Sequence, residues 1–280
     1  MHLKIDDVSF AYSSAPVLND INVDLTGNKF VSILGPNGVG KSTLIHCINK
    51  ILKPTEGAVY LDGADVREVP IKELAKTAGY VPYSSSDTFP LTVVDTVMMG
   101  RHPHSKWGSK ERDMELVYDT LKLLGIEKLA MRPFNELSAG QHQKVMLARG
   151  IVQDPRVLLL DEPTSNLDIK HQVEVTRILR DLSRKKGMLV IMISHDINIA
   201  SKYSDMMIMM HEGTIFSVGT PDEVITEQNL KDVYGINVRI ISDDGRPHVI
   251  LKEPDAEPII KMDCSRSTKV EAKVPQSSSA

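Results

Sequence analysis

The stretch Gly35-Pro36-Asn37-Gly38-Val39-Gly40-Lys41-Ser42-Thr43 decides the fold of this chain. It matches the pattern G-x-x-x-x-G-K-[ST], in which glycines let backbone N–H groups curve around an anion. A helix that begins at Lys41 adds the positive end of its dipole to the same place. The Lys41 ammonium can then reach the outer phosphates of a nucleotide, and the Ser42 hydroxyl can bind Mg²⁺. The stretch therefore predicts a phosphate loop for ATP, with Mg²⁺ as the cofactor.

The residues on either side of the phosphate loop have the pattern of a strand and a helix. Residues 31–34 form a short apolar run that is typical of a buried strand. Leu44, Ile45, Ile48 and Ile51 then recur at helical spacing, which predicts one helix with all four side chains on its apolar face. A glycine turn that binds no phosphate is the non-functional alternative, and these flanks disfavour it.

Composition limits the class of protein. The chain has 280 residues, 41% hydrophobic and 25% charged, which is typical of a soluble globular protein. Its net charge of −4 argues against a nucleic-acid partner held by a basic surface. Cys47 and Cys264 lie in a helix and a polar segment, so no disulfide is expected and a reducing cytosol fits. No apolar run approaches the roughly 20 residues that span a bilayer, and the acids in residues 1–7 argue against a secretion signal.

The pattern changes along the chain. Residues 1–30 look β-rich, and alternation at Val59 and Leu61 precedes the turn Asp62-Gly63, which predicts a small antiparallel layer beside the nucleotide. Tyr12 is expected in the first loop of that layer, either stacking on adenine or as a half-buried strand tyrosine. From about residue 84 to 152 the pattern is helical. Thr92 and Asp95 resemble a capping box there, and Met114, Val117, Leu121 and Leu124 form an apolar stripe for packing.

Two continuous apolar runs, residues 157–160 and 189–193, are typical of parallel strands buried on both faces. Together these patterns predict an α/β fold: a P-loop NTPase core with a parallel sheet, a small antiparallel β layer and an inserted α-helical subdomain at about residues 84–152. One domain is expected to cover residues 1–252. Residues 253–280 have no apolar periodicity and end in a serine run, which predicts a disordered C-terminal tail.

Two adjacent acids, Asp161 and Glu162, follow the first of these runs. The carboxyl end of a parallel strand is where α/β folds bind ligands, and neighbouring side chains there point in different directions. We expect Asp161 to bind Mg²⁺ and Glu162 to act as general base toward an attacking water. An acidic N-cap for the next helix is the alternative, and the phosphate loop favours the catalytic interpretation.

The segment Leu137-Ser138-Ala139-Gly140-Gln141 contains a capping box, because Gln141 follows Ser138 at the third position. This helix start can serve the fold alone, or Ser138, Gly140 and Gln141 can form a second anion site. If the two helix N-termini cannot reach one phosphate chain within a subunit, a second subunit must supply one of them. That predicts a two-fold dimer with the nucleotide at its interface.

His195 follows the second buried run, at the same predicted edge of the sheet. A neutral imidazole there could contact the γ-phosphate or the attacking water. A histidine after a strand is more often a structural hydrogen-bonding group. Because the phosphate loop and the two acids are predicted at the same edge, we favour a catalytic role for His195.

The phosphate loop, the segment 137–141, Asp161-Glu162, Ser165-Asn166-Leu167-Asp168 and His195 together resemble an ABC transporter ATPase subunit. The resemblance covers about residues 3–252. It implies the ABC ATPase fold, ATP hydrolysis coupled to transport, and a head-to-tail ATP-sandwich dimer. Ser138 and Gly140 of one subunit would then face the nucleotide held by Lys41 of the other, and Asp168 would lie in the loop that links the two sites.

The same resemblance implies partners and a location. Residues 84–104 would dock onto an integral membrane permease, which holds the protein on the cytoplasmic face of the membrane. An extracytoplasmic substrate-binding protein would be an indirect partner. Residues 99–104 and 233–238 look like those of importers of iron–siderophore, haem or vitamin B12. A metal site at His102 and His104 is disfavoured, because two ligands with no third partner rarely hold an ion.

One position departs from the family pattern. After Tyr80-Val81-Pro82 the family has a glutamine whose amide oxygen binds Mg²⁺, and here Tyr83 stands in its place. A phenol is a poor neutral ligand for a hard cation. One hypothesis is a working ATPase that powers import. The second is a nucleotide-binding subunit with impaired hydrolysis that acts as an ATP-gated clamp or regulator. A soluble ABC protein outside transport is a third, smaller alternative.

Overall fold

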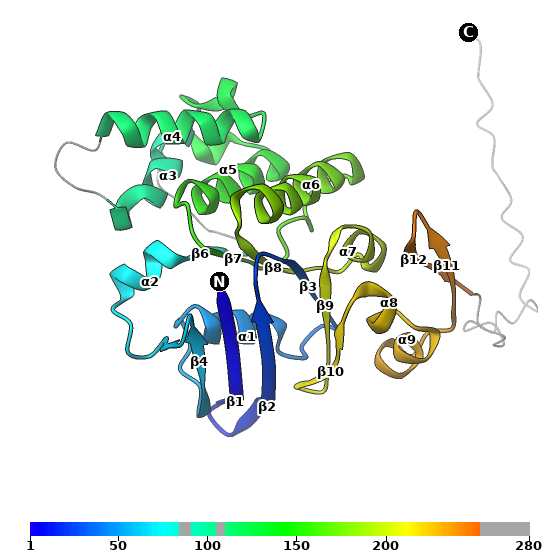
Figure 1. Cartoon of the computed structure of the whole chain (residues 1–280). Coiled ribbons are helices and arrows are strands. Elements are labelled where there is room, and N and C mark those ends of the chain that lie inside the picture. The colour runs from blue at the N-terminus through cyan, green and yellow to red at the C-terminus, as the bar shows by residue number, and fades with distance from the viewer. Residues whose placement is uncertain (84–90, 105–109, 253–280) are drawn as a thin grey trace, which may run out of the picture.

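A computed structural model describes residues 1–83, 91–104 and 110–252 of the chain. A mixed six-stranded sheet forms its centre, with helices α4, α5 and α6 on one side and the strands of a second sheet on the other (Figure 1). The strands of the central sheet, in spatial order, are β10 (Thr214–Gly219), β9 (Met206–His211), β3 (Phe30–Leu34), β8 (Leu189–Ile193), β7 (Val157–Leu160) and β6 (Ala78–Val81).

All neighbouring strands of the central sheet are parallel except the pair β9 and β10. Every residue of β3, β7 and β8 is buried, as the continuous apolar runs predicted. The parallel strands therefore end at a common carboxyl edge, where a site can be assembled from several loops.

The second sheet is antiparallel, in the order β2 (Ala15–Thr26), β1 (His2–Tyr12), β4 (Glu56–Leu61) and β5 (Ala64–Asp65). Its buried side chains share one apolar cluster with α1 (Lys41–Ile48) and with alternate residues of the central strands. This is the predicted small antiparallel layer. The expectation that Tyr12 lies in a loop is wrong, because β1 continues through Tyr12, which pairs with Ala15.

A helical region lies between β6 and β7, and it shares a second cluster with the other face of the sheet. The elements that follow β5 up to β7 are α2 (Ile71–Thr77), α3 (Val93–Met98), the 3₁₀ helices η1 (Met99–His104), η2 (Glu127–Leu129) and η3 (Phe134–Glu136), α4 (Lys110–Leu123) and α5 (Ala139–Val152). Thr92 caps α3 by accepting a hydrogen bond from the Asp95 amide, as expected.

The C-terminal third of the described chain adds a third cluster around β9. Besides the sheet strands already given, this part of the chain forms α6 (Ile169–Lys186), α7 (Ile197–Tyr203), α8 (Pro221–Val224), α9 (Glu227–Tyr234) and a separate hairpin of β11 (Val238–Asp243) and β12 (Arg246–Leu251). The predicted tail at residues 253–280 lies outside the described residues, as do residues 84–90 of the predicted docking segment. No helix in the described parts of the chain is long and apolar enough to cross a membrane.

Two predictions of helix faces are wrong in part. Ile51 lies beyond the end of α1 and is 52% exposed, whereas Leu44, Ile45 and Ile48 are buried on the helix as expected. Met114 is 40% exposed on α4, outside the apolar stripe of its three predicted partners. Both are apolar residues at an approximately helical spacing, and spacing alone does not show where a helix stops or how wide its buried face is.

Candidate active site at the carboxyl edge of the central sheet

Four neighbouring strands deliver the predicted site residues to one edge. The phosphate loop follows β3, His195 follows β8, Asp161 follows β7, and Tyr83 follows β6. The strands are parallel and adjacent in that same order. Segments far apart in the sequence therefore meet because of strand order, which is the usual origin of sites in α/β folds.

The phosphate loop is possible only with glycine at two of its positions. Gly35 has φ 147°, and a Cβ atom there would lie 2.4 Å from the backbone oxygen of Met210. Gly40 has φ 99°, and its Cβ would lie 2.7 Å from a methyl carbon of Leu18. Any side chain at either position would collide with a neighbouring strand, so the loop's path depends on both glycines.

Lys41 begins α1 and is held over the loop. Its ammonium donates hydrogen bonds to the Gly35 carbonyl at 2.8 Å and the Pro36 carbonyl at 2.7 Å, and the residue is 6% exposed. Burial lowers the pKa of Lys41, and the carboxylates of Glu162 and Asp161 oppose that shift. No side chain caps the N-terminus of α1, which leaves its first amide groups suited to an anion.

Ser42 and Asp161 supply the donor set expected for a magnesium ion. The Ser42 hydroxyl donates a 2.9 Å hydrogen bond to Asp161 Oδ1. Burial raises the pKa of Asp161, and the bond from Ser42 opposes the rise. A hydroxyl and a carboxylate are hard oxygen ligands that suit Mg²⁺. Mg²⁺ usually keeps several waters and takes the rest of its ligands from one or two protein groups and from substrate phosphates, so two protein oxygens fit such a site.

Glu162 and His195 form a close pair. His195 Nε2 lies 2.6 Å from Glu162 Oε1. Glu162 has φ 50°, in the left-handed region that L-residues rarely adopt. Both side chains line a cavity of about 490 Å³ that also includes Ile236, Val249 and Leu251 from the C-terminal part of the chain. A carboxylate on a left-handed backbone, paired with an imidazole beside a cavity, is an arrangement suited to accepting a proton.

The structure corrects the alternative role considered for the acid pair. The N-cap of α6 is Asp168, whose carboxylate accepts a 2.9 Å hydrogen bond from the His171 amide. The His171 amide and imidazole lower the pKa of Asp168. Asp161 and Glu162 do not cap this helix, so they are free for the chemistry of the sheet edge. The linking role expected for Asp168 remains a prediction.

The capping box at the second predicted anion site is present, and it makes no direct bond to the phosphate loop. Ser138 caps α5 through the Gln141 amide at 3.4 Å, and the Gln141 side chain accepts a 3.2 Å bond from the Ser138 amide. Gly140 packs beside Leu167. Within the described residues, no hydrogen bond or ion pair joins Ser138, Gly140 or Gln141 to residues 35–43. The contribution of a second subunit therefore remains a prediction.

Tyr12 and Tyr83, the two tyrosines singled out from the sequence, are both exposed. Tyr12 is 50% exposed and packs edge-on against Phe10, with 4.8 Å between ring centroids. Phe10 pairs with Leu18, the residue that contacts the phosphate loop at Gly40, so Tyr12 lies at the loop's end of its sheet. Tyr83 is 46% exposed, just beyond Val81, whose carbonyl accepts a 2.9 Å bond from the Asp161 amide.

A neighbouring pair was not predicted from the sequence. His46 Nε2 lies 2.9 Å from the Tyr80 hydroxyl. Burial raises the pKa of Tyr80 to about 12, and Asp161 adds to the rise. A signal existed, because His46 follows Ser42 by four residues and so shares its helix face. The pair extends the polar network of the site away from Asp161.

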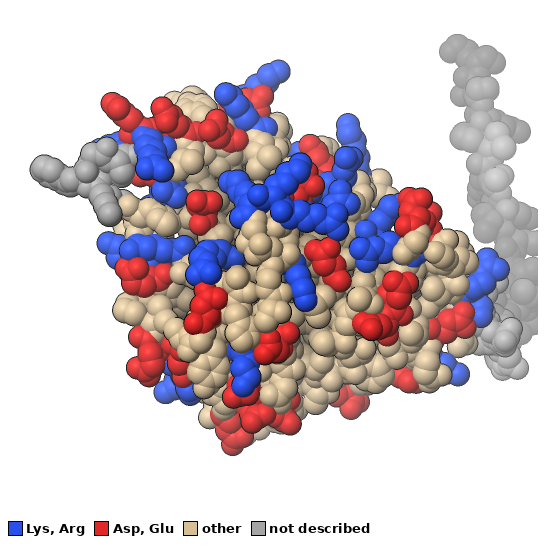
Figure 2. Space-filling model, in the orientation of Figure 1, with Lys and Arg blue, Asp and Glu red and all other residues tan. Residues whose placement is uncertain are grey.

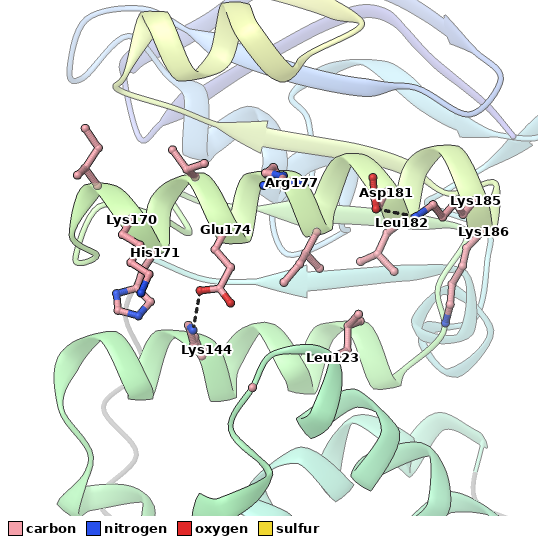
Figure 3. A pocket seen from close by; sticks show the side chains of 14 residues that line it. Leu123, Lys144, Lys170, His171, Glu174, Arg177, Asp181, Leu182, Lys185 and Lys186 are labelled. Carbon is pink, nitrogen blue, oxygen red and sulfur yellow. Dashed lines mark hydrogen bonds and ion pairs between the residues drawn. The ribbon is translucent and has the colours of Figure 1, made fainter.

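A long surface groove lies elsewhere. It has a volume of about 1030 Å³ and runs along α6 beside Lys144 and Leu123 (Figure 3). Figure 2 shows Lys and Arg side chains gathered on this face of the molecule. The acids of the groove are already paired, Glu174 with Lys144 at 3.2 Å and Asp181 with Lys185 at 2.8 Å. It contains no residue of the phosphate loop and neither member of the Glu162–His195 pair, so it is not the reaction site.

Comparisons with known proteins agree with this geometry. The family described as "ABC transporter" matches residues 18–165. An uncharacterized ABC transporter ATP-binding protein of Methanocaldococcus jannaschii is 47% identical over 89% of this chain and 98% of its own length. The iron(3+)-hydroxamate import ATP-binding protein FhuC of Bacillus subtilis is 34% identical over 86% of this chain and 90% of its own. A dimeric ATP-binding cassette in a post-hydrolysis state with ADP and Pi has a TM-score of 0.70 and 29% identity, covering 78% of this chain and 98% of that one.

Proposed function

Because this chain belongs to the ABC transporter family as an ATP-binding ATPase subunit, we propose that it powers uptake of an iron–siderophore chelate through a membrane permease. The observation that supports a working motor is the convergence of Lys41, Ser42, Asp161 and the Glu162–His195 pair on one sheet edge. The iron-chelate cargo is supported by the likeness to FhuC. Haem or cobalamin remain alternative cargoes on the resemblance of residues 99–104 and 233–238.

In this proposal each residue has one task. The phosphate loop, residues 35–43, encloses the phosphates, and Lys41 exchanges its loop carbonyls for phosphate oxygens. Ser42 and Asp161 would hold Mg²⁺, which would supply positive charge against the phosphates. Glu162 accepts a proton from the attacking water, and His195 orients the Glu162 carboxylate.

The assembly is part of the same proposal. A second copy supplies Ser138, Gly140 and Gln141 to the nucleotide, in a head-to-tail dimer, and Asp168 links the two sites. Tyr12 stacks on the adenine through its exposed face. A permease docks on residues 84–104 and holds the subunit at the cytoplasmic face of the membrane, with an extracytoplasmic binding protein as the indirect partner. The ATPase domain covers residues 1–252.

Tyr83 favours a second candidate function. Its phenol replaces an amide at the position after Pro82, so hydrolysis or its coupling to the permease is the step at risk. A subunit that binds ATP and hydrolyses it slowly would act as an ATP-gated clamp.

The Mg²⁺-dependent ATPase rates of wild type, Tyr83→Gln and Glu162→Gln separate the two candidates. Glu162→Gln is expected to lose at least about 100-fold in rate and to keep ATP binding, because only the base is removed. Glu212→Gln is the matched control, since Glu212 also has a left-handed backbone, φ 46°, but lies in the β9–β10 turn.

If wild type is well above Glu162→Gln and Tyr83→Gln changes little, the chain is an ordinary transport motor. If wild type equals Glu162→Gln and Tyr83→Gln restores turnover, the clamp replaces the motor.

Uptake of radioactive iron as a hydroxamate chelate, by vesicles that contain the permease and this subunit, tests the cargo. Labelled cobalamin in the same vesicles is the competing substrate.

A further inference from the structure

The C-terminal hairpin β11–β12 lies beyond the part of the chain that the family description matches. It packs against α7, the short helix that directly follows His195 (Figure 1). Its strands pair only with each other among the described residues. The question is what a separate two-stranded hairpin contributes, since such a unit is not stable by itself in water.

Two side chains of α7 attach it to β12. The Asn198 amide donates a 3.1 Å hydrogen bond to the Val249 carbonyl, and Asn198 Oδ1 accepts a 2.8 Å bond from the Val249 amide. One turn later, the Ser201 hydroxyl donates a 2.6 Å bond to the Pro247 carbonyl, and Ser201 is fully buried. Residues three apart share a helix face, so one face of α7 is fixed along β12.

This attachment bears on His195 through a very short connection. His195 lies between β8 and α7, next to Asp196, which caps α7 by accepting a 2.8 Å bond from the Ile199 amide. On one side the residue is anchored by β8, a fully buried central strand. On the other side α7 has only 7 residues, too few for a helix to be stable alone. The orientation of His195 therefore depends on what holds α7.

The same hairpin also reaches the reaction cavity directly. Val249 and Leu251 of β12 line the cavity that contains Glu162 and His195. Val249 is thus both the backbone partner of Asn198 and a wall of the cavity. A continuous set of contacts runs from β12 through Asn198 and the start of α7 to His195, and then to Glu162 at 2.6 Å.

We propose that Asn198 is a positioning residue for His195, and that hairpin β11–β12 is thereby part of the catalytic apparatus. This inference rests on the proposed roles of Glu162 and His195. Asn198 also lines the cavity, but its side-chain hydrogen bonds within the described residues go to Val249 and not to Glu162 or His195. It fixes the helix that sets the imidazole against the Glu162 carboxylate, and small displacements of a catalytic group lower the rate strongly.

The variant Asn198→Ala removes both bonds to Val249. We expect kcat for ATP to fall about 10-fold or more, while the dissociation constant for ATP stays near that of wild type, because Lys41 and the phosphate loop are untouched. Asn198→Asp keeps the acceptor for the Val249 amide but loses the donor, so it should give an intermediate kcat. Rates are measured well below the unfolding temperature of each variant.

Asn229→Ala is the matched control. Asn229 lies on α9 and also donates its side-chain amide to a backbone carbonyl, that of Val224 at 2.9 Å, beside the same C-terminal cluster, but it does not bond to hairpin β11–β12 through that amide. If Asn198 only stabilised the fold, both alanine variants would lower the unfolding temperature and leave kcat of the folded protein unchanged. That result would overturn the proposal.

A second readout does not depend on turnover. In protein labelled with ¹⁵N-histidine, the His195 imidazole resonance is identified by its loss in His195→Gln. It should shift in Asn198→Ala and stay in place in Asn229→Ala, and an unshifted resonance in Asn198→Ala overturns the inference. If wild type hydrolyses no ATP, the motor proposal fails, and this resonance alone decides the role of Asn198.

Discussion

At the scale of single residues, Cys47 has a property that its position on α1 explains. Cys47 is 2% exposed, and burial raises the pKa of its thiol from 9.0 to about 11. Between those two pH values the folded protein keeps a proton that the unfolded chain has lost. The folded state then binds more protons than the unfolded state, so the free energy of unfolding must fall as the pH rises through this window. Below the window the thiol is protonated in both states and adds no pH dependence.

The variant Cys47→Ala tests this dependence. Urea unfolding near the lower and the upper end of the window should show a larger loss of stability for wild type than for Cys47→Ala. Tyr80, Tyr234 and Cys264 remain in both proteins, so their contributions cancel in the comparison. Equal losses in the two proteins would show that the thiol ionises as freely when folded as when unfolded.

The site residues differ in how far sequence reasoning could reach them. Lys41, Ser42, Asp161 and Glu162 stand in short motifs whose chemistry is local, and the structure brings them together with His195 as expected. Asn198 and the His46–Tyr80 pair could not be predicted in this way. Their partners are 51 and 34 residues away in the chain, and only tertiary packing puts them in contact.

At the scale of elements, a buried ion pair ties the end of the segment expected to dock on the permease to the neighbouring helix α4. Arg101 of η1 donates to Asp113 of α4 at 2.8 Å, with side chains 12% and 8% exposed, and also to the carbonyl of Val152, the last residue of α5, at 2.9 Å. Asp113→Ala should lower stability by about 3 kcal/mol, because it leaves a buried guanidinium without its carboxylate.

The double variant Arg101→Met/Asp113→Leu should recover most of this loss, since it removes both charges together. Removal of Lys76, whose pair with Glu73 is exposed, serves as the control and should change little. Chemical denaturation of the four proteins measures the differences. A single variant as stable as wild type would show that water or another group satisfies Arg101.

Helix starts were more predictable than helix ends or isolated strands. Thr92 and Ser138 cap α3 and α5 because capping depends on residues three positions apart. The end of α1 at Ile48 was missed, since apolar Ile51 continues the spacing while the chain has already turned. Hairpin β11–β12 was not predicted at all. Its strand β11 leaves Ile241 41% exposed, so the pattern of burial does not follow simple alternation.

At the scale of the whole molecule, strand order is what local patterns cannot supply. The sequence order 3, 6, 7, 8, 9 becomes the spatial order 9, 3, 8, 7, 6, and this rearrangement puts β8 and its His195 between the phosphate loop and Asp161. The class of fold follows from apolar runs alternating with helical patterns. The two neighbours of β3, by contrast, come from contacts across more than a hundred residues.

The proposed dimer makes a prediction for mixtures. Lys41→Ala and Ser138→Arg should each abolish ATPase activity, because each homodimer has the same defect in both composite sites. Mixing the two proteins should restore part of the activity, since one site of the mixed dimer then has both Lys41 and Ser138 intact. If each subunit carried a complete site, mixing would restore nothing, and the measured rate would stay at that of the separate variants.

The left-handed backbone of Glu162 has a consequence for how this chain can change. Glycine adopts φ near 50° without the steric cost of a side chain, and relieving such strain is worth on the order of 1 kcal/mol. A laboratory selection for heat resistance alone would therefore reward Glu162→Gly and discard the side chain proposed as the proton acceptor. Glutamate is kept at this position only when turnover is selected as well. The residue found at position 162 in a set of selected thermostable variants would therefore show whether the selection also required activity.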